Sequence, residues 1–220
     1  MDIGRIIPLC GDKVMALMDL QEDPCFSRVS ADMMDSFIST NLDIAVNAAL
    51  ELRKKFPDKS PIDIAKEKGA IVNIIDREFR VMKVQYRSEI YFEGREINIV
   101  KPSIKLMHEQ LKSYIDLSLE KLIEIHVAHE LYHLIEYLEN RATPDLLPEV
   151  VTLRILKYEK KTKILKSSEV AAHAFSKELL KLPFNPKLLD YLYLIQINEI
   201  YEEDFIKHLI KLNKIMYNVH

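Results

Sequence analysis

The chain has 220 residues, 48% of them hydrophobic, which is enough to bury one substantial core and favours a single domain over residues 1–220. Its formal net charge of −3 excludes a general electrostatic attraction to nucleic acid. Two cysteines exclude a disulfide framework, and the chain has neither a signal-peptide pattern nor an apolar run of membrane-spanning length, so we expect a cytoplasmic protein with reduced thiols.

The few glycines and the long Leu-, Ile-, Lys- and Glu-rich segments indicate that helix dominates. We predict helices near residues 12–20, 30–55, 61–68, 103–115, 119–139, 146–160, 168–181 and 186–215. Clusters of β-branched and aromatic residues favour strands at 70–76, 79–86, 88–93 and 96–100, with a hairpin turn at Glu93-Gly94. The sequence therefore predicts a mainly helical α+β fold with a small sheet beside the 119–139 helix. An edge strand of this sheet could hold an extended peptide by strand addition.

The run His129-Glu130-Leu131-Tyr132-His133 places two histidines four residues apart in the predicted 119–139 helix. At 3.6 residues per turn, both imidazoles project from one face and can bind one ion, while Glu130 can reach a water on that ion. A hydrolytic zinc site built on one helical turn needs this HExxH spacing. A metallopeptidase is therefore our leading hypothesis.

The 119–139 helix is apolar too continuously for an exposed helix, which indicates that it is buried. It nevertheless carries four polar side chains on nearly one face: His126, His129, Glu130 and His133. Burying them would be costly unless they found hydrogen-bond partners or a metal ion. A core imidazole bonded to the backbone is the alternative for any single histidine, but the pair at helical spacing favours a metal site.

A catalytic zinc ion takes a third protein ligand and keeps one position for water. The metzincin arrangement is excluded because it requires Gly at position 136 and His at position 139, where this chain has Glu136 and Glu139. The best candidate is Glu169, in the first turn of a helix that Ser167 or Ser168 can cap. That helix has small residues that would let it lie close to the zinc helix, namely Ala171, Ala172 and Ala174. The alternative for Glu169 is an ordinary first-turn carboxylate favoured by the helix dipole.

These residues resemble the signatures of the ImmA/IrrE peptidases. The stretch from His129 to His133 looks like the first signature of this family. The second resembles the run Glu169-x-x-Ala172-x-x-Phe175-x-x-Glu178-Leu179-Leu180, followed by Pro183. Upstream, residues 60–72 are similar to the family's opening helix and first strand, and residues 93–100 to the strand before its zinc helix. The resemblance covers roughly residues 42–185, with helical extensions on either side.

The resemblance implies a zincin-like core, a Zn²⁺ ion bound by His129, His133 and Glu169, and Glu130 as the general base. Substrates in this family are often helix-turn-helix repressors, so it also implies an endopeptidase that cleaves a specific cytoplasmic regulator. The chain departs from the family pattern at three points. Residues 134–168 form a long interval whose charged segment 158–163 looks like a lengthened loop or a helix extension. Tyr132 replaces a glycine, and His173 replaces Asn or Asp.

Four further side chains could orient a ligand or stabilise an oxyanion, namely His126, Tyr132, His173 and Tyr86. For His126, a core histidine is an equally good interpretation. A basic patch that might touch nucleic acid is better explained as a solvated surface, and it comprises Lys157, Lys160, Lys161, Lys163 and Lys166.

Two other functional classes stay open. One is a non-catalytic regulatory or toxin–antitoxin binding module that retains the zincin fold, and the other is a zinc hydrolase that acts on a non-peptide amide. For the leading hypothesis we expect a protein substrate, with no direct binding of nucleic acid and no membrane association. The sequence does not indicate an oligomeric state.

Overall fold

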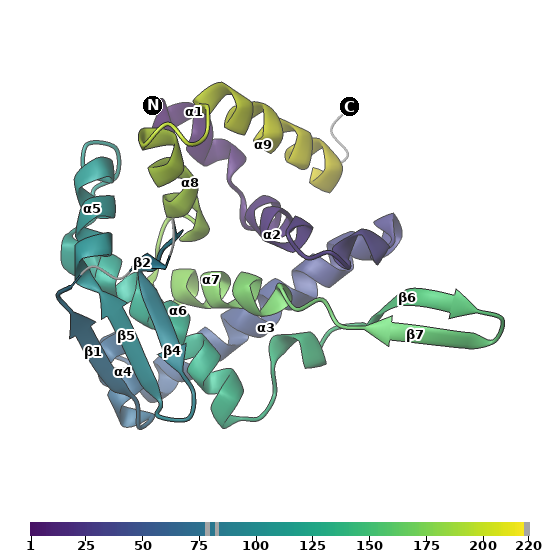
Figure 1. Ribbon diagram of the computed structural model, residues 1–220, viewed down its shortest axis with the longest axis horizontal. Helices are drawn as coiled ribbons and strands as arrows, with labels where there is room; N and C mark the ends of the chain where they lie inside the picture. The colour runs from purple at the N-terminus through teal and green to yellow at the C-terminus, as the bar shows by residue number, and fades with distance from the viewer. Residues whose placement is uncertain (78–79, 82–83, 218–220) are drawn as a thin grey trace.

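The computed structural model describes residues 1–77, 80–81 and 84–217 and has an α+β fold that is about 61% helical (Figure 1). The predicted α+β, mainly helical class is confirmed. Short 3-10 turns lie at Ile7–Leu9, Phe26–Arg28 and, as η3, at Thr143–Asp145. The helices are α1 (Ile3–Ile6), α2 (Asp12–Gln21), α3 (Ala31–Lys55), α4 (Pro61–Glu67), α5 (Lys101–Leu111), α6 (Leu119–Leu138), α7 (Ser167–Leu180), α8 (Lys187–Gln196) and α9 (Glu202–Tyr217). Within the described ranges, no helix combines the length and the hydropathy that a bilayer span requires.

A small sheet lies beside α6, with the strand order β1 (Ile71–Ile75), β5 (Glu96–Val100) and β4 (Ser88–Tyr91). β1 pairs with β5 in parallel, and β4 pairs with β5 antiparallel across a turn that confirms the predicted hairpin at positions 93–94. β4 is therefore an edge strand in the described sheet, and it packs against α6. β2 (Arg80–Val81) and β3 (Val84–Gln85) form a short pair within the predicted 79–86 strand, part of which lies outside the described residues.

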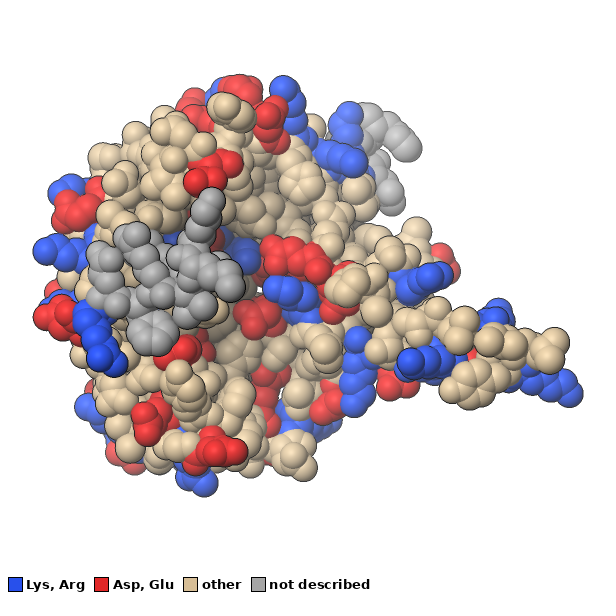
Figure 2. Space-filling view, in the orientation of Figure 1, with Lys and Arg blue, Asp and Glu red and all other residues tan. Residues whose placement is uncertain are grey.

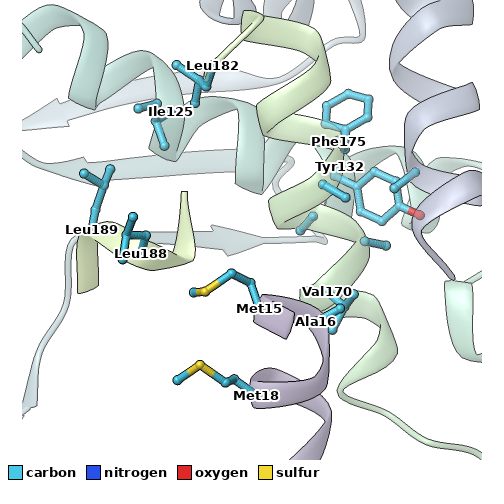
Figure 3. Packing of buried hydrophobic residues seen from close by; sticks show 14 of the residues in the cluster. Met15, Ala16, Met18, Ile125, Tyr132, Val170, Phe175, Leu182, Leu188 and Leu189 are labelled. Atoms are coloured by element: carbon cyan, nitrogen blue, oxygen red, sulfur yellow. The ribbon is translucent and has the colours of Figure 1, made fainter. Parts of the chain in front are cut away.

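α7 packs against α2, α3 and α6 near the centre of the molecule (Figure 1). The predicted packing of α7 against α6 is confirmed, and Ala171 and Ala172 are fully buried in α7. Side chains from α2, α6, α7 and α8 meet in one apolar cluster that includes Met15, Phe175 and Leu188 (Figure 3). Burying a side chain of this size stabilises the fold by about 1.5–3 kcal/mol. The cluster thus fixes α7, and any side chain on it, relative to α6.

Helix α6 forms nearly where the sequence predicts it. Ser118 caps its N-terminus, because the Ser118 hydroxyl accepts a hydrogen bond from the backbone N–H of Lys121 at 3.1 Å. The helix stops before Asn140, whose φ of 48° lies in the left-handed region that asparagine tolerates. Its buried residues recur along most of its length, including Leu122, Ile125, Val127, Ala128, Leu131, Leu134 and Ile135, as expected for a helix that is apolar almost all round.

The predicted helix at 146–160 is wrong, as is the interpretation of segment 158–163 as a loop or helix extension. These residues form an antiparallel hairpin, β6 (Val150–Ile155) and β7 (Tyr158–Thr162), which projects from the body of the molecule (Figure 1). Pro148 disfavours a helix through this region, and the β-branched run Val150-Val151-Thr152 favours a strand. Helix-favouring Leu, Glu and Lys residues nearby masked this signal in the sequence.

The predicted helix at 186–215 is two helices, α8 and α9, joined by a turn at residues 197–201. Asn198 adopts a φ of 60° in this turn, a conformation that ends α8. The break lets α9 fold back over α2, which it contacts together with the Ile7–Leu9 turn. The short helix α1 was not predicted.

Candidate metal centre

The two histidines of the HExxH run lie one turn apart on α6, and Glu169 from the first turn of α7 faces them. The Nε2 atoms of His129 and His133 are 3.2 Å apart. The carboxylate of Glu169 lies 3.3 Å from His129 Nε2 through Oε2 and 3.6 Å from His133 Nε2 through Oε1. The close packing of α6 and α7 therefore brings together three donor side chains that the sequence analysis selected.

The spacing of these donors can be compared with that of a tetrahedral zinc site. Ligand atoms at about 2.0–2.1 Å from a tetrahedral ion are about 3.3 Å from one another. The two Nε2 atoms are 3.2 Å apart, and each lies near a different oxygen of Glu169, at 3.3 Å for His129 and 3.6 Å for His133, so the distances are of the size that a shared ion requires. Two imidazoles and one carboxylate also form a common donor set for catalytic zinc. The residues therefore fit the ion.

A second set of donors overlaps with the first. His129, Glu169 and His173 place one ligand atom each within 4.8 Å of one another and could hold a metal ion. His173 follows Glu169 by one turn of α7, and its ring centroid is 4.7 Å from that of His129. His129 and Glu169 thus belong to both possible sets, while His133 and His173 are alternatives for the third position.

Glu136 supports His133, a role that the sequence analysis missed. The Glu136 Oε2 atom lies 3.1 Å from His133 Nδ1 and accepts a hydrogen bond from the Ser168 hydroxyl, while the backbone N–H of Thr143 donates to Oε1 at 2.6 Å. A carboxylate on Nδ1 fixes the tautomer that leaves Nε2 free to bind a metal. The i, i+3 spacing of His133 and Glu136 on one helix was the available signal.

Glu130 lines the same cavity as the histidines although its side chain is largely buried. The Ser88 hydroxyl on β4 donates a hydrogen bond to Glu130 Oε1 at 2.6 Å. One carboxylate oxygen is thereby held by the edge strand of the sheet. This arrangement places an oriented carboxylate beside the donor cluster, as the HExxH pattern predicts.

The cavity around the cluster has a volume of about 580 Å³ and is walled by β4, α6, α7 and residues 186–190. A second cavity of about 340 Å³ adjoins it, since Phe92, His133 and Ser168 line both. Figure 2 shows a hollow near the centre of this face with acidic side chains around it. The two cavities thus adjoin at His133.

Two cationic side chains, Arg87 and Lys187, line the cavity, and both are paired with carboxylates. Arg87 donates to Asp190 at 2.7 Å and lies over the ring of Tyr193, with 4.9 Å between its guanidinium carbon and the ring centroid. Lys187 pairs with the buried Asp19 at 3.0 Å. Burial raises the pKa of the Asp19 carboxyl to about 6, although Lys187 opposes this shift. This part of the cavity wall is polar yet close to electrically balanced.

In the absence of a bound cation, the protonation of the cluster is governed by Glu169. Burial alone would lower the pKa of His129, but the hydrogen bond to Glu169 and the nearby carboxylates of Glu130 and Glu169 outweigh it and raise the pKa. The hydrogen bond from His129 in turn holds the pKa of Glu169 well below its usual range. The carboxylate is therefore ionised, as a metal ligand must be.

The other four sequence candidates occupy different places. Tyr86, His126 and His173 line the cavity. His126 Nδ1 lies 2.8 Å from the carbonyl oxygen of Leu122, and burial lowers the pKa of this imidazole to about 4, so the ring is neutral. Tyr132 is buried away from the cavity, where its hydroxyl lies 2.6 Å from Thr143 Oγ1 and its ring packs on Phe175. Its position does not support a role in oxyanion binding.

Comparisons with protein-family models, with curated proteins and with solved structures find no match for this chain. Membership of the ImmA/IrrE family, which the two signatures suggest, therefore stays a proposal. The function is inferred from the types and the positions of the residues in the site.

Proposed function

We propose that this chain is a zinc-dependent endopeptidase of the ImmA/IrrE type. The observation that carries the proposal is the meeting of His129 and His133, whose Nε2 atoms are 3.2 Å apart, with the two carboxylate oxygens of Glu169 at 3.3 and 3.6 Å from them. Glu130 follows the first of these ligands directly and lines the same cavity. Three metal ligands and an adjacent carboxylate that can act as general base are the groups that a metal-dependent hydrolase requires.

A bound zinc ion would acidify a water molecule and polarise the carbonyl of the scissile bond. Glu130 would take the proton from that water and deliver it to the leaving amine, which is the work of one carboxylate acting first as base and then as acid. The hydrogen bond from Ser88 keeps the Glu130 carboxylate in one orientation while it does so. Glu136, which lies 3.1 Å from His133 Nδ1, would leave His133 Nε2 available to hold the ion.

The shape of the site supports a peptide substrate. β4 contributes Ser88, Glu89 and Ile90 to the cavity wall, and it is the edge strand of the described sheet. An extended peptide could therefore pair with β4 and pass over the donor cluster. The second cavity, which shares His133 with the first, offers further space for a chain that extends beyond the donor cluster, and this supports cleavage within a chain.

The family resemblance suggests a specific regulator as the substrate, such as a helix-turn-helix repressor. A broadly active hydrolase would endanger every unfolded chain around it, so selectivity has to come from the walls of the two cavities. We expect little digestion of casein, and we expect cleavage at one or a few bonds in a regulator encoded beside this gene.

The test combines metal analysis with cleavage. Purified protein should carry close to one zinc per chain, measured by inductively coupled plasma mass spectrometry, and should cleave the co-expressed neighbouring regulator. Glu130→Gln should keep the metal and lower the cleavage rate about 10²–10⁴-fold, because it removes the base. Glu139→Gln, at an exposed glutamate just after α6, is the matched control and should behave as the wild type.

Each outcome bears on the proposal. Loss of zinc in Glu130→Gln would contradict the assignment of this residue as the base. Rapid digestion of casein would refute the restricted substrate range. Bound zinc without cleavage of any neighbouring regulator would favour the non-catalytic binding module that retains the same fold.

A further inference from the structure

The β6–β7 hairpin extends away from the rest of the molecule (Figures 1 and 2). Its base is anchored, because Val150 is buried and Lys163 forms an ion pair with Asp145. Residues 153–161 beyond this base are all exposed. The outer part of the hairpin, which we call the arm (residues 152–161), therefore contributes little to the core and stands free for contact with something else.

The arm exposes large apolar side chains at its end. Leu156 at the turn is 97% exposed, Tyr158 63%, Ile155 56% and Leu153 46%. Ile155 lies opposite Tyr158, and Leu153 lies opposite Lys160, so three of these four side chains share one face of the hairpin. Contiguous apolar groups on a protruding tip are rare on a surface that meets only water.

The backbone at the tip strengthens this point. Leu156 adopts a φ of 52°, in the left-handed region where hairpin turns ordinarily place Gly or Asn. A leucine there is strained and gains no burial within the chain. Strain combined with full exposure points to a contact outside the chain that Leu156 makes.

Cationic side chains surround the apolar tip. Within the arm they are Arg154, Lys157, Lys160 and Lys161, against the single carboxylate of Glu159, which pairs with Arg154 at 2.6 Å. Successive residues of a strand point to opposite faces, so Lys160 and Lys161 lie on opposite faces of the hairpin. The arm is thus positively charged all round, although the whole chain has a formal net charge of −3.

Against the sequence-based expectation of no membrane association, we propose that the arm docks onto an anionic lipid bilayer surface, with Leu156 and its apolar neighbours inserted at the headgroup boundary. A bilayer surrounds an inserted tip, so it can meet cations on both faces at once, whereas one face of a folded protein could meet only some of them. Duplex nucleic acid would match the charge but would leave the aliphatic tip without an apolar environment. The site suits a peripheral contact and is independent of the catalytic proposal.

The test uses a tryptophan reporter, because the chain contains no tryptophan. Leu156→Trp in the full chain is mixed with vesicles of phosphatidylglycerol and phosphatidylcholine, or of phosphatidylcholine alone. We expect a blue shift of the emission of about 10 nm or more with the anionic vesicles only, as the indole enters an apolar environment. Tyr201→Trp, at a 76% exposed position on the body of the protein, is the matched control and should not shift.

Two variants separate insertion from nonspecific attraction. Leu156→Asn fits the left-handed backbone and removes the apolar tip, and it should reduce the vesicle-bound fraction in sedimentation at least 10-fold. Adding Lys157→Glu and Lys160→Glu to the reporter should abolish the shift. Absence of a shift with anionic vesicles would overturn the proposal, as would a shift of the reporter with duplex DNA but not with vesicles.

Discussion

At the scale of single residues, Glu136 is placed to influence the affinity of the proposed metal site through His133 rather than as a ligand. We predict that Glu136→Gln weakens zinc binding about 10–100-fold, because a neutral amide orients and polarises His133 less than a carboxylate does. A competition titration with a chromophoric chelator measures this change. Glu139→Gln is the control, and an unchanged affinity in Glu136→Gln would show that the pairing is only structural.

The choice between the two possible donor sets also belongs to single residues. His133 lies near both His129 and Glu169 and stands at the HExxH position, so we predict that His133→Ala loses the metal and His173→Ala retains it, although His173 also belongs to a possible donor set. Metal content after dialysis, with circular dichroism to verify folding, decides between them. The reverse result would place His173 in the coordination shell and overturn the family alignment at this point.

The sequence predicts the site residues that share one helix, but it predicts fewer of those that other helices and strands contribute. His129, Glu130 and His133 follow from the period of α6 alone, and Glu169 from a family signature and its place in the first turn of α7. Ser88 and Asp19 lie near the site only because of tertiary packing, so no local sequence pattern predicts their positions. The i, i+3 spacing of His133 and Glu136 in the sequence permits their contact, but at the sequence level Glu136 served only to exclude the metzincin pattern.

At the scale of elements, the errors have a common physical cause. Strong caps and continuous apolar periodicity made α6 predictable to within a residue. The β6–β7 hairpin buries almost nothing beyond its base. Burial therefore does not impose on its sequence the alternation of apolar and polar residues that marks a half-buried strand, and its composition favours helix. The break between α8 and α9 depends on a single asparagine in the left-handed conformation, which composition does not distinguish from one inside a helix.

The hairpin also yields a prediction about stability. Val151 and Lys161 are paired across the two strands, so residues 152–160 can be replaced by Asn-Gly to close a short turn at this point. Because the removed residues are mostly exposed, Tm should change by only a few degrees, and zinc content should stay the same. Differential scanning calorimetry and metal analysis measure both. Collapse of the fold would show that the arm is structural.

At the scale of the whole molecule, the proposed metal site would join the two central helices. His129 and His133 belong to α6 and Glu169 to α7, while α7 also packs against α2 and α3. Unfolding separates these helices and destroys the site, so a metal that binds only the folded chain must stabilise it. The stabilisation at a free zinc concentration 100 times Kd is about 2.7 kcal/mol.

For a chain of this length, such a change corresponds to a rise in Tm of roughly 5–10 °C. We therefore predict that removal of zinc with a chelator lowers Tm by this amount and that added zinc restores it. Glu130→Gln should show the same rise, since Glu130 lines the cavity without being one of the three donors, whereas His133→Ala should show little or none. If zinc raises the Tm of His133→Ala by the same amount, the ion stabilises the protein from another site. In that case only side-chain packing would hold α6 and α7 together.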